Sequence, residues 1–279
     1  MSAQSESPAI AAQRDAYRSV YDTGLAKLLS AIWGGNLHLG LFEHPEQPLA
    51  AAQVRVKNHM ARAAALGAGE RVIEAACGVG TTARHLVTEY GVSVLATNIS
   101  EAQLEEARQT TDKEGLSERI TFRFSDFHAL DIPDRSFDCW WCQEALLYAV
   151  DKRRVLEEAR RAVRRGGRIV FTDLLITHSM PEAERQAFAI DMKTPEMWAI
   201  EDWDRVLREM EFDRLERRDW REHTVWTFVN VANALAEVRD EFVDLIGREA
   251  VEGTEYRIRL QLEKARAGKL GWCFFALAV

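Results

Sequence analysis

The chain has 279 residues, of which 47% are hydrophobic and 29% charged, as in a globular protein built on one large α/β domain. Its 36 basic and 44 acidic residues give a net charge of −8, which argues against nucleic acid as the main partner because phosphate binding needs a basic face. The sequence has no apolar run of the roughly 18 residues that a membrane span needs, no secretory signal pattern and only four scattered cysteines, so we expect a cytoplasmic protein without a disulfide framework.

The first part of the chain is predicted to be mostly helical. Residues 1–12 indicate a flexible tail, and residues 13–31 carry apolar side chains at helical spacing. Residues 32–42 are rich in glycine and aromatic residues and predict a loop, whereas residues 48–66 predict a further helix. We therefore expect residues 1–66 to form a helical cover of the active site.

From residue 72 onwards, strand patterns and helix patterns alternate. The predicted strands cover residues 72–75, 92–97, 120–124, 137–142, 168–173 and 271–279, and the predicted helices cover residues 83–90, 101–114 and 152–163. Such alternation indicates βαβ units and a parallel sheet, here in a domain over residues 67–279. Insertions at about 174–200 and 223–270 follow strand ends, where α/β sheets carry substrate lids, and we expect both to be lids.

The most informative motif is VIEAACGVGTT at residues 72–82. An apolar strand that contains Glu74 runs into a tight turn with Ala76, Gly78 and Gly80, and a helix pattern starts at once. Glycine suits such a turn because it tolerates positive φ and lets a ligand approach the backbone. Further motifs follow at the ends of the next strands, namely Asn98-Ile99, Asp126-Phe127 and Gln143-Glu144, and a double glycine precedes the strand at 168–173.

In this order, the motifs resemble those of the class I S-adenosylmethionine-dependent methyltransferases. The resemblance implies a Rossmann-like α/β fold with a seven-stranded, mostly parallel sheet, and S-adenosylmethionine as the cofactor, which leaves as S-adenosylhomocysteine. It implies that Glu74 contacts the methionine end of the cofactor and Asp126 the adenine, and it places Asn98 where the family usually has a ribose-binding acid. The cofactor-binding residues expected on this basis are Trp33, Glu74, Ala76, Gly78, Gly80, Asn98, Ile99, Asp126, Phe127 and Gln143.

An NAD-type Rossmann enzyme is the alternative interpretation of the glycine turn, because Gly78-x-Gly80-x-x-Ala83 also fits the GxGxxA pattern. Two residues argue against it. Glu74 is acidic where dehydrogenases are usually apolar, and Asn98 replaces the acid that binds the ribose about 20 residues further on.

The flanking segments resemble the sarcosine and dimethylglycine N-methyltransferases. The similar segments are WGGNLHLGL at residues 33–41 and Gln143-Glu144 followed by Leu147-Tyr148, although Tyr148 stands where that family has histidine. The segment with Glu144 also resembles the prenyl diphosphate C-methyltransferases, in which this carboxylate would take a proton or stabilise a carbocation.

Candidate acceptor residues follow from the chemistry of methyl transfer. The enzyme must align a nucleophile with a sulfonium and exclude water. Aromatic faces stabilise a methylated cation by roughly 0.5–2 kcal/mol, and the candidates for such a wall are Tyr21, Trp33, Tyr148, Trp198 and Trp226, with core packing as the alternative. The catalytic candidates are Glu144, Tyr148 and His38, with a purely structural role as the alternative for Glu144 and His38. No histidine spacing suits a metal site.

We therefore expect an enzyme that transfers a methyl group from S-adenosylmethionine to a small molecule, with an amine nitrogen as the favoured acceptor. One alternative is C- or O-methylation of a natural product or a prenyl diphosphate, with Glu144 as the base. A second alternative is a protein that binds S-adenosylmethionine without catalysis. We expect neither a metal nor a nucleic-acid or membrane partner, and the sequence leaves a monomer and a homo-oligomer open.

Overall fold

The computed structural model describes residues 8–21 and 24–279, without the side chains of Tyr17 and residues 19–21. The predicted substrate contact of Tyr21 therefore lies outside the described residues. Two helices, α1 (Pro8–Tyr21) and α2 (Gly24–Trp33), replace the single helix expected over residues 13–31. The tail expected up to residue 12 is helical from Pro8, because proline suits the first helical position and alanine-rich sequence favours a helix.

A seven-stranded sheet forms the centre of the molecule, with the order β3-β2-β1-β4-β5-β7-β6, which confirms the predicted fold class. Neighbouring pairs from β3 to β5 are parallel, and β7 runs antiparallel to both β5 and β6. The strands are β1 (Arg71–Ala75), β2 (Ser93–Asn98), β3 (Ile120–Phe124), β4 (Phe137–Gln143), β5 (Val163–Ile176), β6 (Asp213–Asp219) and β7 (Leu270–Ala278).

Two local expectations were wrong. The edge strand β6 escaped prediction because its sequence DRLERRD is almost entirely charged and lacks a buried face. The double glycine was expected to precede the strand at 168–173, but it lies inside β5. There the register shifts between Phe137 and Cys139, and a Cβ at Gly167 would lie 2.6 Å from the carbonyl oxygen of Asp138.

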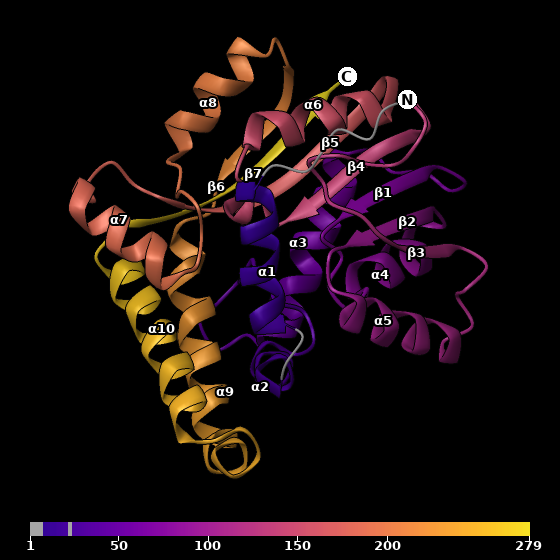
Figure 1. The fold of residues 1–279 in the computed structure, drawn as a ribbon. Helices are drawn as coiled ribbons and strands as arrows, with labels where there is room; N and C mark the ends of the chain where they lie inside the picture. The colour runs from indigo at the N-terminus through magenta and orange to yellow at the C-terminus, as the bar shows by residue number, and fades with distance from the viewer. Residues whose placement is uncertain (1–7, 22–23) are drawn as a thin grey trace.

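Helices cover both faces of the sheet. On one face lie α3 (Leu49–Ala63), α4 (Thr81–Tyr90) and α5 (Glu101–Lys113), and on the other lie α6 (Lys152–Ala162) and α8 (Ile200–Glu209). Ser100 caps α5, since its hydroxyl accepts from the backbone N–H of Gln103 at 3.2 Å. The expected insertions contain α7 (Glu182–Asp191), α9 (Glu222–Ile246) and α10 (Arg248–Arg266). Figure 1 shows the α9–α10 hairpin on one side of α1 and α2, and α4 and α5 on the other.

The strand order creates a natural ligand position. The chain runs from β1 through β2 to β3 at one edge and then returns to β4, which pairs with β1 on its other side. Ligands of open α/β sheets bind at such a switch point, beyond the carboxyl ends of the strands. The candidate site therefore lies among the residues that follow β1 and β4.

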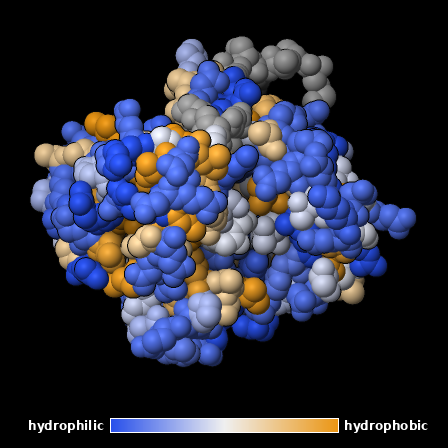
Figure 2. Space-filling model, turned by 90° about the horizontal axis from the view of Figure 1, so that it is seen from below, coloured by the Kyte–Doolittle hydropathy of each residue, from blue (hydrophilic) through white to orange (hydrophobic). Residues whose placement is uncertain are grey.

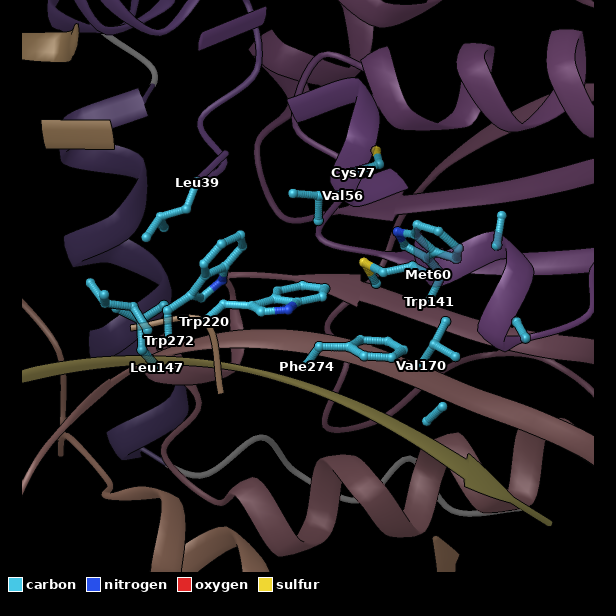
Figure 3. Close-up of a cluster of buried hydrophobic side chains, with 14 of the residues drawn as sticks. Leu39, Val56, Met60, Cys77, Trp141, Leu147, Val170, Trp220, Trp272 and Phe274 are labelled. Carbon is cyan, nitrogen blue, oxygen red and sulfur yellow. The ribbon is translucent and has the colours of Figure 1, made fainter. Parts of the chain in front are cut away.

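Most tryptophans belong to the core. Trp141, Trp220, Trp272 and Phe274 lie over one face of the sheet, beside Met60 of α3 (Figure 3). Trp140 and Trp203 pack on the opposite face, also fully buried. This packing accounts for the high tryptophan content without a ligand.

A third hydrophobic core joins the two ends of the chain. Leu28 of α2 and Ala52 of α3 pack with Val231 and Leu235 of α9 and with Ile258 of α10. The N-terminal helices and the C-terminal hairpin therefore form one body over the sheet. On the hairpin side, apolar side chains show between hydrophilic ones (Figure 2). None of the described helices is both long and apolar enough to cross a membrane.

Candidate active site

A tight turn joins β1 to α4 at the carboxyl edge of the sheet. Ala76, Gly78 and Gly80 have positive φ angles of 58°, 54° and 75°. A Cβ at Gly80 would lie 2.8 Å from the ring of Phe122, so this position requires glycine. Ala76 adopts the same left-handed conformation although it has a Cβ, at a cost of roughly 1–2 kcal/mol.

Glu74 lies in β1 directly before this turn and is 3% exposed. Burial raises the pKa of its carboxyl to about 8, and the positive charges of Lys57 and Arg84 act against that rise. Lys57 of α3 is equally buried, and burial lowers the pKa of its ammonium to about 8. Oε2 of Glu74 is a buried oxygen without a hydrogen-bond partner among the described residues.

Gln143 ends β4 on the other side of the turn and lines the cavity described below. Its Oε1 accepts from the Thr82 hydroxyl and from the Trp141 indole, both at 3.1 Å, which fixes the orientation of the amide. Its Nε2 is buried and lacks a partner in the part of the chain that the structure describes. Unpaired buried polar atoms are costly, so Glu74 and Gln143 present two groups that a polar ligand would satisfy.

The ends of β2 and β3 hold the remaining predicted cofactor residues. The amide of Asn98 is engaged within the protein, since Nδ2 donates to Gln103 at 2.8 Å and Oδ1 accepts from the backbone N–H of Ile99 at 2.8 Å. Asp126 accepts from the backbone N–H of His128 at 2.8 Å, and the adjacent ring of Phe127 packs edge-on against the imidazole of His128. All four lie at the same edge of the sheet as the glycine turn, although none of them lines the cavity.

A cavity of about 550 Å³ opens beyond the turn. Residues 76–79 line its floor, and its walls come from the 34–39 loop, the segment after β4, and helices α2 and α10. The structure brings seven of the predicted site residues to its lining, namely Trp33, His38, Ala76, Gly78, Gln143, Glu144 and Tyr148, whereas Glu74 and Gly80 do not line it.

Glu144 follows β4 in a strained conformation, with φ of +42°. Its carboxylate is 5% exposed. Oε1 accepts from the indole N–H of Trp272 at 2.8 Å, and Oε2 lies 2.8 Å from Nδ1 of His38. The contact with His38 is a close approach of charge-bearing atoms that is not aligned as a hydrogen bond. A carboxylate and an imidazole thus meet at the cavity wall beside the glycine turn.

The loop that carries His38 is held in place by Gln53. This buried side chain of α3 donates through Nε2 to the carbonyl oxygens of Asn36 and His38, at 2.7 and 2.8 Å. The Thr81 hydroxyl of α4 donates to the carbonyl of Gly35 at 3.0 Å. The loop is therefore tied to the helices on either side of the turn.

Sequence reasoning did not single out the side chains that hold the catalytic candidates. Asp173 of β5 accepts from the backbone N–H of Leu147 at 3.0 Å and from the indole of Trp203 at 3.2 Å, and burial raises its pKa to about 7. Trp272 lies 128 residues after Glu144 in the chain, and Gln53 sits inside a helix pattern. No local signal marks these residues, because their partners come together only through the fold.

Of the four predicted wall residues whose side chains the structure describes, Trp33 and Tyr148 line the cavity. The Trp33 ring packs edge-on against Phe228, with centroids 6.2 Å apart. Trp198 packs on Trp203, and Trp226 packs edge-on against Phe42 at 5.9 Å; neither side chain lines the cavity.

Comparisons with known proteins agree with this arrangement. A family model described as a methyltransferase domain matches residues 73–171. A sarcosine/dimethylglycine N-methyltransferase of Aphanothece halophytica is 27% identical over 267 residues, which are 95% of either chain. The 27-O-demethylrifamycin SV methyltransferase of Amycolatopsis mediterranei is 29% identical over 89% of this chain and 92% of its own. The methyltransferase GfsG of Streptomyces halstedii is 30% identical over 71% of this chain and 73% of its own.

The chain belongs to the class I S-adenosylmethionine-dependent methyltransferases. The methyltransferase also shares its fold with the crystal structure of a putative sarcosine dimethylglycine methyltransferase from Galdieria sulphuraria, with a TM-score of 0.82 and 23% identity over 96% of this chain and 98% of that one. S-Adenosylmethionine is its cofactor.

The residues at the turn fit this cofactor. Its methionine end carries an ammonium and a carboxylate. The buried Oε2 of Glu74 is an acceptor without a donor, and the buried Nε2 of Gln143 is a donor without an acceptor. Between them, the backbone of Ala76 to Gly78 is open to the cavity. Gln143 lines the cavity, whereas Glu74 precedes the turn in the chain and does not line it; the free donor and the free acceptor match the carboxylate and the ammonium in chemistry.

Proposed function

We propose that the protein transfers the methyl group of S-adenosylmethionine to a hydroxyl oxygen of a largely apolar small molecule. The observation that carries this proposal is the contact between His38 and Glu144 in the cavity wall, next to the glycine turn. A hydroxyl is a weak nucleophile that must lose its proton as the new bond forms, so the reaction needs a base at this position.

His38 is proposed as that base. Its buried Nδ1 faces Glu144, and the side chain is 15% exposed, so the opposite edge of the ring, with Nε2, is the one available to the cavity. The hydroxyl proton would pass to Nε2, and the carboxylate of Glu144 would stabilise the imidazolium that results. Trp272, which donates to the other carboxylate oxygen, would keep Glu144 in position.

S-Adenosylmethionine supplies an electrophilic methyl group on a positively charged sulfur. We propose that Glu74, Gln143 and the backbone of residues 76–80 hold its methionine end. The resemblance assigns the ribose and adenine end to Asn98-Ile99 and Asp126-Phe127. Because the amide of Asn98 already makes three internal hydrogen bonds, one of them to the carbonyl of Gly78, we expect it to contribute mainly by shaping the turn around Gly78.

The lining of the cavity supports an apolar acceptor. Its wall includes Leu29, Trp33, Leu37, Phe228 and Ile258. An amino acid acceptor would carry its carboxylate a few ångströms from the reacting nitrogen, where it would need a cation. The described lining residues from the 34–39 loop and from the segment after β4 contribute no lysine or arginine there.

Methylation of an amine is the second candidate. It is supported by the flanking segments and by the N-methyltransferase relative, which matches 95% of the chain. The same pair of His38 and Glu144 would take a proton from an ammonium, and the faces of Trp33 and Tyr148 would stabilise the cationic product.

Mass spectrometry of reactions with S-adenosylmethionine and an acceptor panel tests the proposal. The panel holds glycine, sarcosine, dimethylglycine, phenols, hydroxylated polyketides, thiols and prenyl diphosphates. Methyl gain on hydroxylated acceptors supports the proposal, and methyl gain on amino acids alone replaces it by the second candidate. Cofactor binding without product across the panel would contradict both and favour a protein that binds S-adenosylmethionine without catalysis.

A further inference from the structure

Three cations line the outer part of the same cavity. They are Lys27 of α2, Lys193 just after α7 and Arg257 of α10. Lys27 and Lys193 are exposed and Arg257 is half-buried, so all three belong to the opening rather than to the depth of the cavity. None of them has an ion-pair partner within 4 Å in the described part of the chain.

What sets these three cations apart is their convergence on one opening. Elsewhere many basic side chains sit in ion pairs, such as Arg168 with Glu70 at 2.7 Å and Lys264 with Glu184 at 2.8 Å. Three unpaired cations brought to one opening from three separate helical regions point to a binding role.

Besides Glu144, which pairs with His38, two acids share the lining, and neither neutralises the three cations. Asp191 at the end of α7 accepts from the Tyr256 hydroxyl at 3.4 Å. Glu106 belongs to α5, on the side of the cavity that borders the turn after β1 and the start of α5. The side formed by α2, α7 and α10 therefore keeps an excess of positive charge.

The helical regions around this opening also contribute apolar side chains to the cavity. Leu29, Met192, Phe228 and Ile258 come from α2, the end of α7, α9 and α10, the same helical regions that carry or adjoin the cations. A ligand that fills this space is therefore polar at its reacting end, apolar in its middle and in contact with positive charge at its far end.

We propose that the acceptor is an amphipathic molecule with an anionic group, a carboxylate or a phosphate, held by Lys27, Lys193 and Arg257 at the opening. This inference rests on the proposed function for the placement of the reacting end. The cations bind the anion at a distance from the methyl transfer, so they select the acceptor and orient its length in the cavity.

A matched pair of dyes tests the charge preference directly. 8-Anilinonaphthalene-1-sulfonate and N-phenyl-1-naphthylamine share an apolar body and differ by one anionic group. Fluorescence titrations use the full chain with S-adenosylhomocysteine present, so the result does not depend on methyl transfer. We expect the sulfonate to bind roughly tenfold more tightly than the neutral dye, and this difference to shrink as NaCl is raised.

Two arginines of α10 supply the matched variants. Arg257 lines the cavity, whereas Arg259 is exposed and does not. Arg257→Gln, alone and with Lys193→Gln, should remove most of the preference for the sulfonate and leave binding of the neutral dye unchanged, whereas Arg259→Gln should change neither. Equal binding of the two dyes, no binding of the sulfonate, or equal effects of Arg257→Gln and Arg259→Gln would overturn the inference.

Displacement of the sulfonate dye distinguishes the sources of the anion. Decanoate, decyl phosphate and decanol compete under the same conditions. Stronger displacement by decanoate indicates a carboxylate as the bound group, and stronger displacement by decyl phosphate indicates a phosphate. If decanol displaces the dye as strongly as both anions do, the inference is contradicted. These binding measurements do not depend on methyl transfer. If the enzyme methylates hydroxyl groups but binds both dyes equally, the proposed function stands and only the anion site is overturned.

Discussion

At the scale of single residues, the most telling feature is the conformation of Glu144. Its φ of +42° is costly for a residue with a β-carbon, and the surrounding contacts hold it there. The backbone N–H donates to the carbonyl of Thr172 at 3.0 Å, and the carboxylate is fixed by Trp272. The strain places the carboxylate beside His38 at the end of β4, which is where a reacting group would meet the cofactor.

Glu144→Gln tests the acid–base pair. The amide keeps the size of the side chain and an oxygen that accepts from Trp272, but it loses the charge that would stabilise an imidazolium at His38. We expect kcat/KM for a hydroxyl acceptor to fall by roughly 10²–10⁴, with an unchanged Kd for S-adenosylmethionine. Steady-state kinetics and calorimetric cofactor titration measure the two quantities.

His38→Gln serves as the partner variant. Because the two residues are proposed to act as one unit, the double variant should be little worse than either single one. Additive losses, or a single variant with more than half of the original kcat/KM, would remove the pair from the mechanism.

Glu74 gives a prediction about pH. Its folded pKa of about 8 lies above the ordinary value of 4.5, so between about pH 5 and pH 8 the folded chain holds a proton that the unfolded chain has released. The stability of the ligand-free protein should therefore fall as pH rises through this window. Glu74→Gln should flatten that fall, while also weakening binding of S-adenosylmethionine.

Thermal unfolding of the ligand-free protein from pH 5 to pH 8 measures the effect as the difference in Tm between the two proteins. Asp173 also has a raised pKa, which lowers stability in the same direction as pH rises. Because both proteins contain Asp173, the difference between their Tm values reports on Glu74. Parallel Tm curves for the original protein and the variant would contradict the prediction.

At the scale of elements, the loop between α2 and α3 matters most. It has no regular structure, yet several buried hydrogen bonds hold it. The N–H of Gly40 donates to the Thr227 hydroxyl of α9 at 3.2 Å, and the N–H of Phe42 donates to Nδ1 of His223 at 3.2 Å. The loop is therefore hydrogen-bonded to α9 on one side and to Gln53 of α3 on the other, and these bonds set the position of His38.

Gly40→Ala should disturb this loop. A Cβ at Gly40 would lie 2.6 Å from the Cβ of Ala52 and 2.9 Å from the ring of Phe42, so the loop must move away from α3. We expect a loss of roughly 1–3 kcal/mol in the free energy of unfolding and a lower kcat. Gly67→Ala is the control, because a Cβ there meets nothing within 4 Å, and its effect should stay within about 0.5 kcal/mol. Urea denaturation of both variants checks the difference, and equal stabilities would contradict it.

Element prediction succeeded where one face of an element is buried. The strands from 72 to 142 alternate with helices that pack on them, and their apolar patterns place them within one or two residues. It failed at β6, an edge strand of mostly charged residues, and at the start of α1, where no tertiary contact could be read from the sequence.

At the scale of the whole molecule, the N-terminal helices and the C-terminal hairpin form the cover of the cavity together. Their shared core contains Leu28, which is fully buried, and Val231 and Leu235 of α9. Segments about 200 residues apart in the chain therefore depend on one another for the shape of the cavity.

Leu28→Ala tests this dependence. The variant leaves a cavity between α2 and α9, and we expect a loss of roughly 2–5 kcal/mol in the free energy of unfolding. Leu245→Ala in α9 removes a side chain that is 58% exposed and should change stability by less than about 0.5 kcal/mol. Denaturant unfolding measures both, and a Leu28→Ala protein as stable as the control would show that the cover folds independently of this contact.

The sequence by itself determined the fold class and the cofactor, and it placed the predicted cofactor motifs at one edge of the sheet. Each cofactor motif ends a strand or follows it directly, so strand periodicity and a few turn residues are enough to place it. Only the tertiary structure decided how His38, Glu144 and Trp272 meet, and that Trp198 and Trp226 pack away from the cavity. Glu144 meets His38 and Trp272 across more than 100 positions of the chain. Such contacts depend on how helices pack over the sheet, and the local sequence pattern does not encode that packing.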